Sequence, residues 1–205
     1  MTNTIDNIKS TIGRHKGLAR SNRFGVFITP PKSLNKSSGQ SESTEEMRDM
    51  NLLCESCSMP GRQIQTFDVK YFRQDIKTAQ GFINEDISIT FNLTSDFFIK
   101  RIFDDWTNLI IDRESYKLNY GNVYKRDIEI YQLNSENEIT YKVKMKNAFP
   151  ISVQAVELGN ANGDVQQVTV EFTYEDFVEE EVAIIKDSRI DGLFRAPINF
   201  INAFA

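Results

Sequence analysis

The sequence predicts a mainly β fold: a β-sandwich or partly open barrel of antiparallel strands, with one covering α-helix. Three segments alternate apolar and polar residues, so each would have one buried and one solvated face. Their apolar positions are Ile87, Ile89, Phe91 and Leu93, then Ile139, Tyr141, Val143 and Met145, and finally Val168, Val170, Phe172 and Tyr174. Glycine and asparagine gather between such segments, most clearly in residues 159–164. Both features are typical of strands joined by tight turns.

The chain begins with a segment of helical spacing, followed by one strand and a polar stretch. Apolar residues recur mostly three or four apart within residues 4–20, which predicts a short amphipathic helix. They are Ile5, Ile8, Ile12 and Leu18. Residues 23–29 alternate and predict a strand, which the two prolines that follow would end. Residues 30–50 are rich in Ser, Lys, Asn, Gly and Glu, so we expect a long mobile loop on the surface.

Further segments predict the remaining strands and a single helix between them. The strand segments cover residues 50–59, 65–72, 85–93, 126–133, 139–146, 149–158 and 165–177. A helix is expected over residues 95–111, approximately, because apolar side chains recur there at helical spacing. Thr94 or Ser95 is placed to cap its first turn. The side chains expected to pack this helix onto the sheets are Phe98, Ile102, Phe103, Trp106, Leu109 and Ile110. We therefore expect the helix to close one face of the sandwich.

Charge is unevenly distributed along the chain. The formal net charge of −5 divides into +6 over residues 1–36 and −11 over the remainder. A basic segment of this kind suggests an arm that docks on a protein neighbour, or alternatively an arm that binds nucleic acid. It contains no aromatic residue before Phe24, and the acidic remainder would repel a phosphate backbone. We therefore favour a protein neighbour.

The length of the chain suits one globular domain with additions. We expect a basic N-terminal arm over residues 1–22, the β domain over 23–177, and a C-terminal extension for partner contacts over 178–205. The extension begins acidic and ends apolar, and an exposed apolar segment usually marks an interaction site. No apolar run is long enough to span a membrane, and the N-terminus lacks the apolar core of a secretory signal. We therefore expect a soluble protein, made in a cytoplasm, with no membrane partner.

Cys54 and Cys57 have the spacing of metal ligands or of a redox pair. A structural zinc site needs four ligands, and the single histidine, His15, lies far upstream. A redox CxxC belongs at the start of a helix, whereas Ser-Met-Pro-Gly follows here. In an extended strand, residues three apart point to opposite faces. We favour structural thiols with Cys54 inward, and a small zinc or redox binding module is the alternative.

The residues that usually carry catalysis do not form a recognisable set. One histidine in a basic arm leaves no supported pair of nucleophile and base. Neighbouring carboxylates such as Asp104 and Asp105 are better explained as a solvated helix face. The sequence contains no GxGxxG, GxxxxGK[ST] or HExxH motif. We predict that the protein is not an enzyme and that it has neither cofactor nor metal.

Three motifs follow one another along the chain. A Pro-Gly step, Pro60–Gly61, comes after the cysteine-bearing strand, and the predicted helix contains the pair Asp105–Trp106. The closing pattern consists of Pro150, Val153, Leu158, Asn160, Asn162, Val168, Val170, Phe172 and Tyr174. In this order the motifs resemble the tail-tube protein family of contractile-tailed, T4-like bacteriophages. The similarity covers roughly residues 18–177.

The resemblance implies a β-sandwich subunit of a hexameric ring, in which hairpins join to form a large inter-subunit β-barrel around a channel. Stacked rings would form the tail tube, a structural part of the virion through which the genome is ejected. The implied partners are further copies of the chain, the tail sheath protein, the baseplate or tube initiator, and the tape measure protein, with DNA only in transit. Assembly would take place in the cytoplasm of the host bacterium.

The resemblance also suggests roles for individual residues. The segment from Arg73 to Gly81 matches a loop that reaches the next subunit or ring, and its predicted contact residues are Arg73, Gln74, Asp75 and Lys77. The polar faces of the wall strands supply lumen candidates, namely Ser88, Thr90, Thr169, Glu171 and Thr173. A basic row conflicts with an acidic lumen; it comprises Lys142, Lys144 and Lys146. Either this row faces a sheath or a neighbour, or cross-strand Glu residues neutralise it.

Two variants of the same class stay open. A baseplate tail-tube initiator, which would form the first ring, suits the long loop at 30–50 and the apolar end of residues 178–205. A secretion-system tube or a contractile bacteriocin, built on a similar fold, is the other variant.

Overall fold

The structure is a computed structural model that describes residues 4–15, 17–31, 33–34, 44–72, 74–158, 163 and 165–180. Its strands are β1 (Phe24–Ile28), β2 (Cys54–Cys57), β3 (Arg62–Tyr71), β4 (Gln74–Asn84), β5 (Ile87–Asn92), β6 (Arg126–Leu133), β7 (Ile139–Val153), β8 (Gln167–Thr173) and β9 (Asp176–Glu180). Its helices are α1 (Thr4–Arg14), α2 (Thr44–Leu52), α3 (Phe98–Ile110) and α4 (Gly121–Tyr124). The strands pair antiparallel throughout, which confirms the mainly β prediction.

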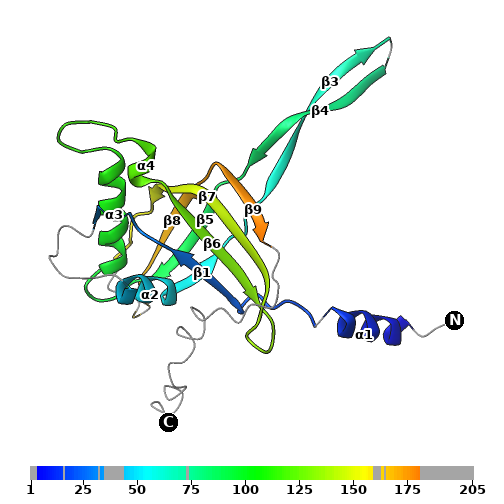
Figure 1. The fold of residues 1–205 in the computed structure, drawn as a ribbon, viewed down its shortest axis with the longest axis horizontal. Helices are drawn as coiled ribbons and strands as arrows, with labels where there is room; N and C mark the ends of the chain where they lie inside the picture. Colours follow the sequence, from blue (N-terminus) through cyan, green and yellow to red (C-terminus); the bar gives the residue numbers. More distant parts are fainter. Residues whose placement is uncertain are drawn as a thin grey trace.

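One long strand, β7, links two parts of the main sheet. The strand order is β1-β6-β7-β8-β5-β2, and β9 also pairs with β7 (Figure 1). The first part of β7 lies between β6 and β9, whereas residues 149–153 pair with β8. The two ends of the order, β1 and β2, do not pair with each other. The described strands therefore form an open arrangement and not a closed barrel.

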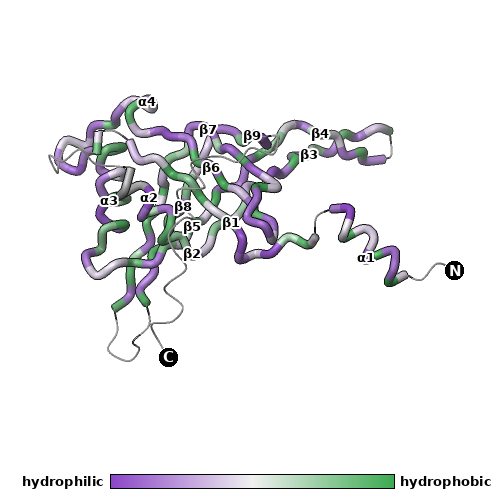
Figure 2. The backbone as a smooth tube through the Cα atoms, turned by 60° about the horizontal axis from the view of Figure 1, so that its bottom comes forward, coloured by the Kyte–Doolittle hydropathy of each residue, from purple (hydrophilic) through white to green (hydrophobic). Residues whose placement is uncertain are grey.

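The core is made by the alternating faces that the sequence predicted. The inward side chains of β1, β5, β6, β7 and β8 form one buried cluster, and hydrophobic and hydrophilic stretches alternate along these strands (Figure 2). Its strand members include Val26, Ile28, Ile87, Ile89, Phe91, Ile128, Ile130, Met145, Val168, Val170 and Phe172. The prediction that Tyr141 faces inward was wrong, because this residue is 39% exposed.

Helix α3 covers this core with aromatic side chains. The ring of Phe103 lies 5.3 Å from that of Phe91 and 5.7 Å from that of Phe172, measured between centroids. Trp106 is buried beside them, and its Nε1–H donates a 2.9 Å hydrogen bond to the carbonyl of Tyr124. The buried indole thus keeps a partner for its polar group, as burial of a tryptophan requires. The prediction that a helix between the strands covers the core is confirmed.

The helix differs from the prediction in its packing residues and its start. Phe103 and Trp106 are fully buried, and Phe98 and Ile102 pack partly buried against the core. Of the other predicted packing residues, Ile110 packs partly buried against the core and Leu109 is half-buried outside the core cluster. The prediction missed Ile99, which is fully buried. Neither Thr94 nor Ser95 caps the helix. It begins later, after a left-handed residue, and the carboxylate of Asp96 accepts bonds from Thr94 and from the Phe98 N–H.

The polar stretch at 30–50 is not wholly a loop. Helix α2 begins at Thr44 and continues to Leu52, and Met50 is completely buried in the core. The neighbouring Asn51 is also buried, and its Oδ1 accepts a 3.0 Å hydrogen bond from the Ile28 N–H of β1. This contact anchors the helix to the edge strand. Residues 35–43 of the expected loop lie outside the described residues.

Several strand boundaries also differ from the predicted ones. Residues 50–53 belong to α2 and its end, so β2 is shorter than expected. The two strands predicted at 139–146 and 149–158 are one continuous strand, β7, which continues through Pro150 at an irregular register. The last predicted strand is instead divided into β8 and β9. Strand β9 extends past the boundary that we expected at 177. The predicted N-terminal helix is present, as α1, but ends at Arg14.

Candidate assembly interface

Strands β3 and β4 form a long hairpin that projects from the body of the molecule (Figure 1). At about 3.3 Å per residue, ten residues of β3 reach roughly 33 Å. All of β3, and all of β4 except Asn84, is exposed. A two-stranded ribbon of this kind is marginally stable on its own, since it buries little apolar surface. The hairpin therefore has the character of an element made to pack on something else.

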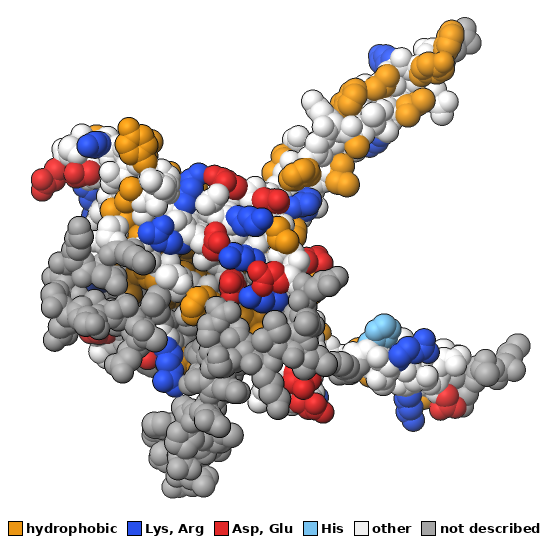
Figure 3. Space-filling view, viewed as in Figure 1, with side chains coloured by type: hydrophobic (Ala, Val, Ile, Leu, Met, Phe, Trp, Pro, Cys, Tyr) orange, Lys and Arg blue, Asp and Glu red, His pale blue; other side chains and the backbone are white. Residues whose placement is uncertain are grey.

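The outer part of the hairpin has one apolar and one charged face. Residues directly opposite each other in antiparallel strands share a face. The apolar face includes Phe67, Val69, Tyr71 and Ile76, all exposed, and hydrophobic side chains follow the hairpin in the space-filling view (Figure 3). The other face carries two pairs of opposite charge: Asp68 opposite Lys77, and Lys70 opposite Asp75.

The hairpin tip exposes a further aromatic residue. Phe72 is 94% exposed and has a φ of 56°, a left-handed conformation that is unusual for a bulky side chain. Its ring contacts that of Tyr71 edge-to-face, with the centroids 5.3 Å apart. An exposed phenylalanine held in a turn is costly unless a partner covers it, which indicates an interaction site.

We expected a contact loop at residues 73–81, and this was wrong, because the described part of the segment forms a strand. Its described residues belong to β4, and among the predicted contact residues Gln74 lies opposite Tyr71 while Asp75 and Lys77 lie on the charged face. Arg73 lies outside the described residues. Sequence reasoning missed the apolar face, although the alternation of Phe67, Val69 and Tyr71 was visible and could have pointed to it.

The predicted lumen residues lie together on the polar face of β5 and β8. Ser88 is opposite Glu171, and Thr90 is opposite Thr169 with their hydroxyl oxygens 3.0 Å apart. Thr173 continues the same face along β8. A chain of amide contacts extends it: Gln167 donates to Asn92 at 3.1 Å, and Asn92 donates to Glu55 of β2 at 2.8 Å.

This polar face carries no positive charge. Strands β2, β5 and β8 contain neither lysine nor arginine, and their only charged residues are Glu55 and Glu171. Binding to a nucleic-acid backbone depends on lysine and arginine that neutralise phosphates. The face could therefore lie beside a polyanion without holding it.

The lysine row on β7 is matched by carboxylates. Lys142 Nζ lies 3.1 Å from Glu129 of β6 and 2.7 Å from Glu180 of β9. Lys144 Nζ lies 3.1 Å from Asp127. For Lys142 and Lys144 the structure thus supports neutralisation across strands, the second of the two alternatives, and these ion pairs join β6, β7 and β9.

The two cysteines pack on the same side, against the core. We expected them on opposite faces of a strand, and this was wrong, because the register of β2 shifts between Cys54 and Ser56. Burial raises the pKa of Cys54 to about 12 and that of Cys57 to about 11. Thiolates bind metal and exchange disulfides, whereas protonated thiols do neither. The described residues contain no group of His, Cys, Asp or Glu that could hold a metal ion.

Comparison with known proteins identifies the fold. The family model for phage tail tube proteins matches residues 19–180. The chain belongs to this family. Tail tube proteins are structural components of phage tails. No helix in the described part of this family member is long and apolar enough to cross a membrane.

Solved structures with the same fold come from contractile injection systems. One chain in the anti-feeding prophage baseplate, determined with six-fold symmetry, is 16% identical with a TM-score of 0.54, covering 80% of this chain and 95% of its own. A chain of the sheath-tube complex of the PVC system is 19% identical with a TM-score of 0.53, covering 80% and 93%. A chain of the anti-feeding prophage cap is 16% identical with a TM-score of 0.56, covering 80% and 91%. No curated protein matches the sequence.

Proposed function

We propose that this tail tube protein forms hexameric rings that stack into the tube of a contractile phage tail, around a channel for genome ejection. The observation that carries the proposal is the β3–β4 hairpin. Its apolar face and its tip are exposed in the single chain, and stacking of rings would cover them. Apolar burial is the main favourable term in most protein association.

The charge of the two sheet faces suggests which one lines the channel. The polar face of β2, β5 and β8 has hydroxyl and amide groups and two glutamates, but no cation. DNA would pass such a wall without being retained, because no counterions are released by contact with it. We therefore propose that Ser88, Thr90, Thr169, Glu171 and Thr173 face the lumen.

The proposed partners follow from a tube within a contractile tail. The tail sheath protein would surround the tube, the baseplate or tube initiator would start it, and the tape measure protein and DNA would occupy the channel. In this arrangement the protein is part of the virion and assembles in the host cytoplasm. The solved relatives come from a sheath-tube complex, a baseplate and a cap, which is consistent with such surroundings.

Negative-stain electron microscopy and native mass spectrometry of the purified chain test the proposal. We expect hexamers and stacked rings with a central channel, both for the full chain and for a variant that ends at Glu180. Hexameric rings that never stack would instead favour a baseplate tube initiator. Monomers at every concentration, with and without a preformed ring as template, would contradict the proposal.

A further inference from the structure

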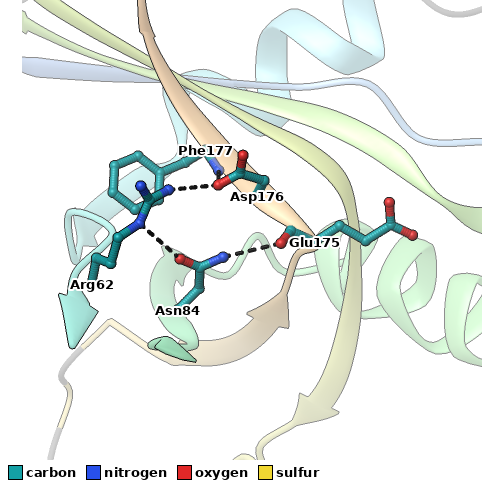
Figure 4. A network of polar contacts seen from close by, with 5 residues as sticks. All are labelled: Arg62, Asn84, Glu175, Asp176 and Phe177. Carbon is teal, nitrogen blue, oxygen red and sulfur yellow. Dashed lines mark hydrogen bonds and ion pairs between the residues drawn. The ribbon is translucent and has the colours of Figure 1, made fainter. Parts of the chain in front are cut away.

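We propose that Arg62 is a positioning residue that fixes the angle between the β3–β4 hairpin and the body of the subunit. Arg62 is the first residue of β3, and its side chain turns toward β9 (Figure 4). This inference rests on the proposed function only in its last step, the effect on assembly. The local claim, that Arg62 aims the hairpin, concerns the single chain.

The guanidinium of Arg62 is held between two aromatic rings from different elements. Its carbon lies 4.5 Å from the ring centroid of Phe82 on β4 and 4.6 Å from that of Phe177 on β9. Its Nη2 lies 2.6 Å from Oδ1 of Asp176, which also accepts a 2.9 Å bond from the Phe177 N–H. A planar guanidinium suits stacking and directed hydrogen bonds together, whereas a lysine ammonium suits neither geometry as well.

A second contact, to the residue just before β9, lies beside the first. Arg62 Nε donates to Oδ1 of Asn84, the last residue of β4, at 3.3 Å. The amide of Asn84 then donates to the carbonyl of Glu175 at 3.0 Å (Figure 4). Both strands of the hairpin are thus tied at their base to residues 175–177. Because both strands are attached, the hairpin resists rotation relative to the body, whereas attachment of one strand alone would allow it to rotate.

Besides these contacts, the hairpin is attached where its strands run on into the β2–β5 pair, and the Glu85 N–H there donates a 3.1 Å hydrogen bond to the Gly61 carbonyl. Within the described residues, β3 and β4 contact each other extensively and every other element at most marginally. At a length of roughly 33 Å, a swing of about 10° at the base moves the tip by about 6 Å. That displacement is many times the tolerance of a hydrogen bond or a packed side chain. A ring can accept the tip only if the base holds its direction.

The contacts of Arg62 are partly exposed to solvent, which indicates that they position the hairpin more than they stabilise the fold. The side chains of Arg62 and Asp176 are 38% and 49% exposed, and ion pairs so accessible to water contribute little to stability. A variant that lacks this side chain should therefore fold, with a hairpin that is no longer fixed in direction. A folded variant with a hairpin of variable direction would show that Arg62 positions the hairpin and is not needed for the fold.

Distance measurement between two spin labels tests the inference on the single chain. We place one label on the hairpin (Lys77→Cys) and one on the β6–β7 turn (Ser135→Cys), in a background in which the native thiols are replaced by alanine. The parent should give one narrow distance distribution. Lys77 is seven residues from Asn84, the last residue of β4, so it lies roughly 23 Å from the base. In Arg62→Ala the distribution should therefore shift or broaden by about 4 Å, the displacement expected there for a 10° swing.

Matched variants make the outcome specific. Lys144→Ala removes a surface ion pair of similar exposure that joins β6 and β7 without touching the hairpin, and should leave the distribution as in the parent. If Arg62→Ala fails to fold by circular dichroism, Asn84→Ala and Asp176→Asn carry the same test. An unchanged distribution in the folded Arg62 variant, or equal broadening in Lys144→Ala, would overturn the inference.

The effect on assembly is measured separately. If only about a tenth of the molecules hold the hairpin in the competent direction, apparent affinity between rings falls about tenfold. Arg62→Ala should therefore raise the concentration needed for tube formation by about this factor, and a broadened hairpin with unchanged assembly would refute the role in assembly. If the parent forms no rings at all, the proposed function fails, while the label distances still decide whether Arg62 aims the hairpin.

Discussion

The hairpin tip offers a substitution that should change assembly without harming the monomer. Phe72 is 94% exposed and left-handed, with φ at 56°. Asparagine adopts this conformation far more readily than a bulky residue does. Phe72→Asn should therefore leave the free energy of unfolding of the monomer unchanged or slightly higher. If the next subunit covers the tip, the same substitution must weaken assembly.

The size of the effect follows from the area that a phenylalanine buries. Covering a fully exposed Phe side chain contributes about 1.5–3 kcal/mol. Because about 1.4 kcal/mol corresponds to a factor of ten in affinity, each contact between subunits should weaken between about tenfold and 150-fold. The concentration at which rings and tubes begin to form should rise by a factor in that range.

Pelleting of tubes over a concentration series measures this threshold. Tyr116→Asn is the matched control, since Tyr116 is also an exposed aromatic residue, at 83%, with a φ of 53°, but lies in the turn after α3. It should leave the threshold unchanged. A threshold for Phe72→Asn within about twofold of the parent, well under the range that burial predicts, would show that no partner covers the tip.

Three further predictions concern the body of the subunit. Phe103→Ala should lower the free energy of unfolding by about 3–5 kcal/mol, measured by urea denaturation, because its ring contacts three other core aromatics. Leu109→Ala should cost far less, and equal losses would contradict the packing described. Lys142→Ala should destabilise more than Lys144→Ala, since Lys142 is only 16% exposed and pairs with two carboxylates, while a single exposed pair contributes about 0.2–1 kcal/mol. The cysteine thiols should react with maleimide at pH 7 about 100-fold more slowly than a free cysteine, because burial raises the pKa of Cys57, the lower of the two, from 9.0 to about 11. The reaction rate should increase with pH. Rapid reaction at pH 7 together with stoichiometric zinc would instead support the zinc or redox binding module.

Alternation along the strands predicted the core well because burial on one face of a sheet imposes it directly. The faces of β5 and β8 were predicted residue by residue, and the aromatic face of α3 was found from its spacing. Helix α2 was not predicted because its sequence is mostly polar, and the burial of Met50 reveals what it packs against. That contact comes from tertiary structure, which local composition does not contain.

The candidate assembly interface was predicted only in part, for a similar reason. A period of two says that Phe67, Val69 and Tyr71 share a face, but not that the face is left uncovered in the single chain. The two thiols were placed on opposite faces because a strand without irregularities would place them so, and the shift in register that brings them together has no sequence signal that we recognise. Arg62 was not singled out at all, because its partners on β9 are more than a hundred residues away.

Cryo-electron microscopy of assembled tubes tests the central claim most directly. We predict a hexameric ring in which the face of Ser88, Thr90, Thr169 and Glu171 lines the channel and the apolar face of the β3–β4 hairpin is buried against another subunit. A ring with that polar face turned outward, or with the hairpin free in solvent, would contradict it.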